Sequence, residues 1–267
     1  RRLGSRFNSP WGHKTMPELP EAEVTTRKLR PLIVGKRILN LGGRNILRVE
    51  RKGKAILIHI SGGKILGFHQ RMTGKLLIVR RGWKDKHTHH IFKLSDGNDL
   101  VFHDVRKFGV MWYGASKKVL KDNYFKTLGP DALLISFLEF KKLFRSQKTK
   151  IKLFLLNQKN IAGIGNIMAD EVLWHAKIYP ERNIKTLRYI EVKRLWKSIK
   201  FILKRSIKFG GTTMRDWLHP GGEKGGYFRK RYAYGREGEK CFRCESKISR
   251  KKIGGRSAHF CPKCQRM

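Results

Sequence analysis

Short apolar runs separated by turn residues fill the first half of the chain. Sequences such as Ser61-Gly62-Gly63 lie between the runs, and this arrangement is typical of the strands of a sandwich or barrel. Glu21 to Leu32, ahead of the runs, carries glutamates in its opening turn and Arg30 near its end, which complements a helix dipole and predicts a helix. The apolar runs cover 55–60, 64–68, 75–79, 91–94, 99–102 and 110–113.

The spacing of apolar residues changes after Gly129-Pro130. From Ser136 onward the apolar positions recur about every 3.6 residues, which predicts a helical domain. Further helices are predicted at 165–176 and 190–209. The segment 212–239 is rich in glycine and aromatic residues without a regular period, so we expect a long loop that runs into a strand.

Four cysteines form two C-x2-C pairs at the end of the chain, Cys241 with Cys244 and Cys261 with Cys264. Each pair brings two thiolates to one side of a tetrahedron, so the spacing predicts one structural Zn²⁺ with all four positions filled by protein. The residues between the pairs predict a β-hairpin with a basic tip formed by Arg250, Lys251, Lys252 and Arg256.

The net charge predicts that this globular protein binds a polyanion. The chain has 61 Lys and Arg against 20 Asp and Glu, a formal charge of +41, spread among apolar residues along its whole length. This pattern favours a folded body with a basic face. No apolar stretch approaches the roughly 18 residues that span a bilayer, and no signal segment opens the chain, so we expect an intracellular protein of the bacterial cytoplasm and no membrane partner.

Residues 1–15 have no apolar period, and we expect them to be an extension outside the fold, with translation beginning at Met16. The predicted fold class is α+β multidomain. The domains are expected at 16–130 (a β-sandwich with a flanking helix), 131–235 (helical) and 236–267 (zinc finger). One copy carries a complete set of parts, so a monomer is expected.

A set of separated motifs runs from Met16 to Gln265: 16–21 (MPELPE), Lys54, 69–74 (HQRMTG), 104–109 (DVRKFG), 162–182 (AGIGNIMADEVLWHAKIYPER), 210–217 (GGTTMRDW) and the cysteine module. Through these motifs the chain resembles the formamidopyrimidine-DNA glycosylase and endonuclease VIII family. The resemblance implies a catalytic β-sandwich, a helix-two-turn-helix domain and a zinc-finger hairpin. It also implies base excision repair of double-stranded DNA that contains oxidised bases or abasic sites, by a glycosylase with AP-lyase activity.

The resemblance makes the amine of Pro17 the nucleophile and Glu18 the general acid and base. An α-amino group of pKa about 7.7 to 8.0 is substantially neutral near pH 7.5, whereas a lysine is almost fully protonated. Attack at the sugar C1′ by a secondary amine gives a cationic iminium, an electron sink for β- and δ-elimination. Without the resemblance, Glu18 and Glu21 would be read as charges that complement a helix N-terminus.

The remaining site residues also follow from the resemblance, and each has an ordinary alternative. Lys54 and Arg256 would hold phosphates near the lesion, although a lysine beside a strand is more often only solvated. Asn166 would bind the DNA backbone, and it could equally be an N-cap. His69 would contact phosphate or lie in a core. Met72, Arg106 and Phe108 would fill the gap left by an extruded base, although Met and Phe are usually core residues.

The glycine-rich segment 219–228 resembles the lesion-capping loop of the formamidopyrimidine branch and favours 8-oxoguanine and formamidopyrimidines as substrates. An endonuclease VIII-like activity on oxidised pyrimidines is the alternative. A third reading is a non-catalytic DNA-binding protein, because the Pro17 nitrogen is an amide in the 267-residue chain. A zinc-ribbon RNA-binding or ribosomal protein would explain the charge and cysteines, but it leaves the MPELPE opening unexplained.

Overall fold

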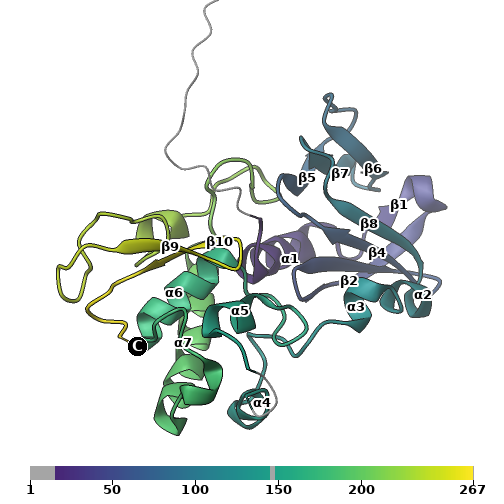
Figure 1. The fold of residues 1–267 in the computed structure, drawn as a ribbon. Coiled ribbons are helices and arrows are strands. Elements are labelled where there is room, and N and C mark those ends of the chain that lie inside the picture. The colour runs from purple at the N-terminus through teal and green to yellow at the C-terminus, as the bar shows by residue number, and fades with distance from the viewer. Residues whose placement is uncertain (1–15, 145–147, 267) are drawn as a thin grey trace, which may run out of the picture.

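A computed structural model describes residues 16–144 and 148–266. The expectation for residues 1–15 therefore lies outside the described residues. Figure 1 shows two sheets on one side, the helices α4 to α7 and the hairpin β9–β10 on the other, and α1 between them. Within the described ranges, no helix combines the length and the apolar character needed to cross a membrane.

The first helix begins two residues earlier than the sequence predicts. α1 spans Leu19–Ile33, with Pro20 in its first turn, where a missing N–H costs nothing. Three of its buried residues, Ala22, Leu29 and Ile33, pack against the sheets. The short elements that follow are β1 (Arg37–Ile38) and η1 (Leu39–Leu41).

Two antiparallel sheets form the predicted β-sandwich. One has the order β1-β2-β3-β4-β8 and the other β5-β7-β6. Apolar side chains of both sheets, such as Phe68, Phe92 and Phe102, meet in one core with the buried face of α1. The strands are β2 (Arg44–Lys52), β3 (Ala55–Ile60), β4 (Lys64–His69), β5 (Gly74–Arg80), β6 (Thr88–Lys93), β7 (Asn98–Asp104) and β8 (Val110–Ala115).

Strand β2 is absent from the sequence prediction. Only Ile46 and Val49 of its nine residues are fully buried, and they lie three positions apart. The pairing with β3 shifts register between Ile46 and Arg48, so the extra residue breaks the alternation of apolar and polar positions. The strand therefore has no period-two pattern in the sequence.

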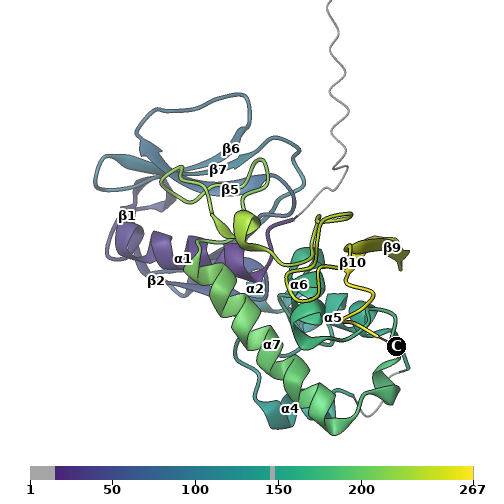
Figure 2. The ribbon, with the colours of Figure 1, turned by 90° about the vertical axis from the view of Figure 1, so that its left-hand side faces the viewer.

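The helical domain follows the predicted order. Short helices α2 (Ser116–Leu120) and α3 (Asn123–Lys126) close the sandwich, and α4 (Phe137–Lys142) and α5 (Ile151–Leu156) follow. The two predicted longer helices are α6 (Asn166–Ala176) and α7 (Tyr189–Lys208), with η2 (Ile184–Thr186) before α7. Figure 2 shows α7 running from α1 toward α4, and it packs on both of them.

The predicted strand within 212–239 is wrong, because this segment contains the short helix η3 (Tyr227–Lys230) and no strand. A side chain of α6 takes the place of a neighbouring strand. Glu171 is fully buried, and its carboxylate accepts hydrogen bonds from the backbone N–H groups of Tyr232, Ala233 and Tyr234. These N–H groups are satisfied by one side chain instead of a strand partner.

The predicted hairpin consists of β9 (Ser249–Ile253) and β10 (Arg256–Phe260), with Gly254 and Gly255 in its turn. A fully buried ion pair joins it to the helices. Lys152 of α5 binds the carboxylate of Asp170 and the backbone oxygen of Ser257, and Asp170 accepts from the backbone and ring of His259. The hairpin is thereby held against α5 and α6.

Candidate active site

Glu18 joins the N-terminal sheet domain to the helical domain. Its buried carboxylate accepts hydrogen bonds from the backbone N–H groups of Gly165 (2.7 Å), Ile167 (2.8 Å) and Met168 (3.1 Å) at the N-terminus of α6. The partial positive charge of a helix N-terminus favours a carboxylate at this position. The start of α1 and the start of α6 therefore meet around one acid.

Burial decides the protonation of this acid. Removal from water raises the pKa of Glu18 to about 7, against the lowering effects of Lys54 and of the α6 amides. Glu21 raises it further by repulsion. Near neutral pH the carboxyl group therefore exists in both forms, which is the condition for a group that both donates and accepts protons.

Glu21 holds α1 to a third segment. Its Oε1 accepts from the backbone N–H of Thr212 (2.6 Å), and its Oε2 accepts from the backbone N–H of Glu18 (2.7 Å). Burial raises the pKa of Glu21. The segment after Gly210 and Gly211 is thus anchored directly beside the first turn of α1.

Two glycines allow Glu18 and Leu19 to approach the helical domain closely. A Cβ at Gly165 would lie 2.3 Å from the Glu18 carboxyl carbon. Gly163 has a φ of +107°, and a Cβ there would lie 2.4 Å from Leu19. Pro17, immediately before Glu18, is buried at this junction. Steric contact with Glu18 and Leu19 therefore explains why positions 163 and 165 are glycines in the AGIG sequence at 162–165.

Lys54 is buried and lies beside the acids. It occupies the tight turn between β2 and β3, and its backbone N–H donates to the hydroxyl of Tyr124 (3.1 Å). Burial lowers the pKa of Lys54, and attraction to Glu18 and Glu21 raises it. The alternative of a solvated lysine is therefore wrong.

His69 ends β4 and lies close to the same turn. Its ring contacts Tyr124 edge to face, with 5.2 Å between ring centroids, and its Nδ1 accepts from the backbone N–H of Arg71 (3.0 Å). Burial, with Arg71 and Lys54 nearby, lowers the pKa of His69 to about 3. The imidazole is therefore neutral, with Nε2 left as its N–H donor.

Met72, Arg106 and Phe108 form one cluster beyond His69. The Arg106 guanidinium donates to the Met72 sulfur (3.3 Å) and lies 4.6 Å from the centroid of the Phe108 ring. Phe108 is 51% exposed, and Met72 is partly buried, so neither is a core residue. The backbone N–H of Arg106 donates to Thr73 and Asp104, which fixes the loop that carries it.

Asn166 and Arg256 lie on the elements that the sequence predicts. Asn166 is the first residue of α6, its N-cap is Gly165, and its side chain contacts Tyr234. Arg256 is exposed at the first position of β10, and its charge acts on Lys54. The Glu18 amide contacts, Lys54 and Asn166 thus occur together at one end of α6, with Arg256 close enough to influence Lys54.

The four cysteines meet the requirements of a zinc site. The sulfurs of Cys241, Cys244, Cys261 and Cys264 lie within 4.8 Å of one another. Tetrahedral Zn–S bonds of about 2.3 Å require sulfurs roughly 3.8 Å apart. The indole N–H of Trp174 in α6 points to the Cys241 sulfur at 3.4 Å. The chain therefore has one structural zinc site, which is tied to α6.

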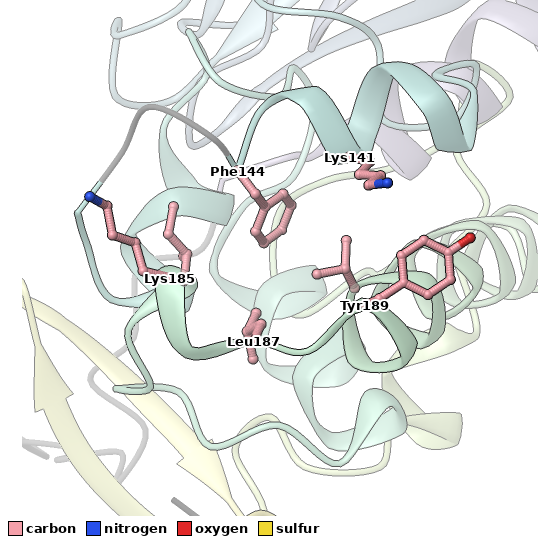
Figure 3. Close-up of a pocket in the computed structure, with 7 residues that line it drawn as sticks. Lys141, Phe144, Lys185, Leu187 and Tyr189 are labelled. Carbon is pink, nitrogen blue, oxygen red and sulfur yellow. The ribbon is translucent and has the colours of Figure 1, made fainter.

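A cavity of about 460 Å³ on the helical domain is not part of this site. Figure 3 shows Phe144, Leu187 and Tyr189 around it, together with Lys141 and Lys185. Among the described residues of its lining there is no carboxylate, cysteine or histidine. These residues therefore supply neither a carboxyl group for proton transfer nor a metal ligand.

Comparison with family models identifies the class of protein. Residues 39–111 match the formamidopyrimidine-DNA glycosylase N-terminal domain and 128–217 match the formamidopyrimidine-DNA glycosylase H2TH domain. Residues 238–266 match a zinc finger found in FPG and IleRS. These matches, in this order and on this site geometry, define a DNA glycosylase.

Whole-chain comparisons give the family. A formamidopyrimidine-DNA glycosylase of Heliobacterium modesticaldum is 38% identical over 94% of this chain and all of that relative, and one of Pelotomaculum thermopropionicum is 39% identical with the same coverage. A Lactococcus lactis FPG mutant in complex with DNA containing Fapy-dG has a TM-score of 0.86 at 34% identity, covering 94% of this chain and all of the other. Thermus thermophilus MutM (FPG) has a TM-score of 0.85 at 34% identity, over 93% and 98% of the two chains. The chain belongs to the formamidopyrimidine-DNA glycosylase family and is an enzyme of base excision repair with glycosylase and AP-lyase activity.

Proposed function

We propose that this enzyme removes oxidised purines from duplex DNA and then cleaves the strand by β,δ-elimination, with Pro17 as the nucleophile. The observation that carries the proposal is the environment of Glu18. The residue next to Pro17 has a buried carboxyl group of pKa about 7, held by three backbone amides and set near Lys54. A nucleophilic amine and a proton-transfer group thus stand side by side.

The first step is base release. The lone pair of the Pro17 nitrogen forms a bond to C1′, and the electrons of the glycosidic bond leave with the damaged base, which takes up the N–H proton that the attacking amine loses. Protonated Glu18 then gives its proton to the ring oxygen as the C1′–O4′ bond breaks and the sugar opens, and the nitrogen lone pair forms the cationic iminium. This step requires a free amine, so the chain must begin at Pro17 in the active form.

The second step is strand cleavage. The iminium withdraws electrons, the Glu18 carboxylate takes the proton from C2′, and the 3′ phosphate leaves with the electrons of its C–O bond. Loss of the C4′ proton to solvent expels the 5′ phosphate in the same way. Lys54 and Arg256 supply the positive charge that attracts the flanking phosphates, and water finally hydrolyses the iminium and frees Pro17.

The proposed DNA contacts come from residues around the same site. The side chain of Asn166, the neutral imidazole of His69 and the exposed guanidinium of Arg256 carry donors suited to phosphate oxygens, whereas the first amides of α6 already bind Glu18. The cluster of Met72, Arg106 and Phe108 presents apolar surface and one cation, which suits the gap left by a flipped nucleotide. We therefore place duplex DNA across the N-terminus of α6.

The segment 219–228 supports an oxidised purine as the flipped base. It is fixed at both ends, because Ile78 of β5 donates its backbone N–H to Pro220 (2.9 Å) and Gly225 donates to the Thr213 hydroxyl (2.8 Å). A Cβ at Gly225 would lie 2.4 Å from two backbone oxygens, so only glycine fits. Gly221, Glu223 and Lys224 are exposed in the same segment, where their backbone is open to the approach of a base edge.

Cleavage of defined duplexes tests the lesion assignment. We expect kcat/KM for 8-oxoguanine opposite cytosine to exceed that for thymine glycol opposite adenine by at least about tenfold, because hydrogen-bonding sites reject analogues that leave their donors unpaired. Phosphate at both ends of the gap is the expected product of β,δ-elimination. The reverse preference would assign the oxidised-pyrimidine activity, and tight binding without cleavage of either duplex would make the protein a non-catalytic binder.

A further inference from the structure

A strongly basic cavity of about 500 Å³ lies at the end of α6 farthest from Asn166. The C-terminal end of α6, the start of α7 and the zinc module form its walls. Glu191 is the one carboxylate among its described lining residues, and Arg182 and Arg188 neutralise it. The cations of the cavity are Lys177, Arg182, Arg188, Arg243, Lys263 and Arg266.

Several of these cations are held in place before any ligand binds. The guanidinium of Arg243 donates to the backbone oxygens of Trp174 (2.6 Å) and His175 (3.0 Å), and it lies 3.8 Å from the centroid of the Trp174 ring. Arg182 is fixed by Glu191 and by the backbone oxygen of Thr186. An anion would therefore meet positive charges whose positions are already fixed.

Lys177 contributes a second, independent feature. It is the C-cap of α6 in the left-handed region, with a φ of 56°, where glycine would be free of strain. A lysine at this position directs a charged side chain into the cavity wall in spite of that strain. In the part of the chain that the structure describes, Lys177, Lys263 and Arg266 form no ion pair with a carboxylate.

The cavity is separated from the surface where we place the DNA substrate. Asn166 and Lys177 lie eleven residues apart, about 16 Å along the helix axis. Arg256 and Phe260 likewise lie at opposite ends of β10, and two of the zinc cysteines, Cys261 and Cys264, follow Phe260. Asn166 and the cavity therefore lie at opposite ends of the same helix.

We propose that this cavity binds the phosphate backbone of a second DNA segment while the first segment occupies the active site. The inference rests on the proposed placement of the substrate duplex. Binding of two segments gives the enzyme a path from one stretch of DNA to another without complete dissociation. It also gives a binding partner, the phosphates of the second segment, to the cations of the cavity, which lie far from Glu18 and Pro17.

Bridging of two labelled duplexes tests the proposal. The full enzyme is first trapped by borohydride on a short duplex with 8-oxoguanine, and binding of a second, undamaged duplex is then followed by energy transfer between the two labels. The variant K177G/R188A/R266A removes three cations and relaxes the backbone at residue 177. The matched variant K117A/K118A/K121A removes three exposed cations around α2. The yield of borohydride trapping shows whether each variant is folded and carries out the proposed reaction. This measurement is independent of the binding of the second duplex.

We expect the Kd for the second duplex to rise at least tenfold in the cavity variant and less than threefold in the α2 variant. The slope of log Kd against log salt should fall by about three, one for each lost phosphate contact. Equal effects of both variants, or no bridging by trapped enzyme, would overturn the proposal. Inorganic phosphate should displace the second duplex no better than another salt of the same ionic strength. Displacement by phosphate at a lower ionic strength than that salt requires would assign the cavity to free phosphate. If no variant is trapped, the proposed Pro17 reaction is contradicted but the second DNA site is not. Binding of the second duplex would then be measured with the enzyme bound to a duplex that carries an abasic-site analogue.

Discussion

Replacing Glu18 by glutamine is expected to slow base release and strand cleavage by about 1,000-fold, within the range that general acid–base catalysis contributes. Glutamine has nearly the same shape, and its amide oxygen can accept from the N–H groups of Gly165 and Met168, but its NH2 group then faces the N–H of Ile167, and it cannot transfer a proton. The measurement is single-turnover cleavage of an 8-oxoguanine duplex. The matched control is Glu50→Gln, which removes one partly exposed carboxylate from β2.

The pH dependence of the unfolding free energy separates a structural effect of Glu18→Gln from its catalytic effect. Burial raises the pKa of Glu18 from 4.5 to about 7, so its contribution to stability is complete below pH 4.5 and is lost as the pH rises through 7. The difference is about 3 kcal/mol at 1.36 kcal/mol per pKa unit. The unfolding free energy of the glutamine variant should lack this decline. Cleavage within tenfold of the unsubstituted enzyme would contradict the catalytic role.

Replacing Cys261 by serine is expected to release the zinc and to reduce cleavage at least 100-fold. A two-stranded hairpin is marginal by itself, and metal binding supplies most of the folding free energy of such modules. Loss of the hairpin removes Arg256 from the neighbourhood of Lys54. Zinc content and cleavage are measured together.

The control for the zinc prediction is Pro262→Ser, which introduces the same residue at an exposed position between two ligands. It should keep the metal and most of the activity. A Cys261→Ser protein that loses zinc but cleaves at the normal rate would show that the hairpin has no part in the reaction.

The sequence predicts the sandwich, the long helices and the zinc module because each has a strong local pattern. Glu18 and Lys54 are identified by resemblance to a family, whereas the reasons for their positions are long-range. Glu18 meets the amides of α6 about 150 residues later in the chain. The backbone of Lys54 is bound by the hydroxyl of Tyr124, 70 residues later, which no local pattern connects with it.

Two features could not be predicted, and both have a physical cause. The bulge in β2 removes the alternation by which a strand is recognised. Glu171 looks like an ordinary glutamate of a helix, yet it is buried and organises the segment 232–234 through three backbone hydrogen bonds. A buried acid that binds backbone amides leaves no periodic signal in a sequence.

Borohydride trapping tests the central claim most directly, namely that the amine of Pro17 attacks the sugar. A chain that begins at Pro17 is compared with the 267-residue chain, in which the Pro17 nitrogen is an amide, on a duplex with 8-oxoguanine opposite cytosine. We expect a covalent adduct only from the first chain, and mass spectrometry should locate it on the Pro17 peptide. An adduct on a lysine such as Lys54, or equal trapping of both chains, would contradict the account.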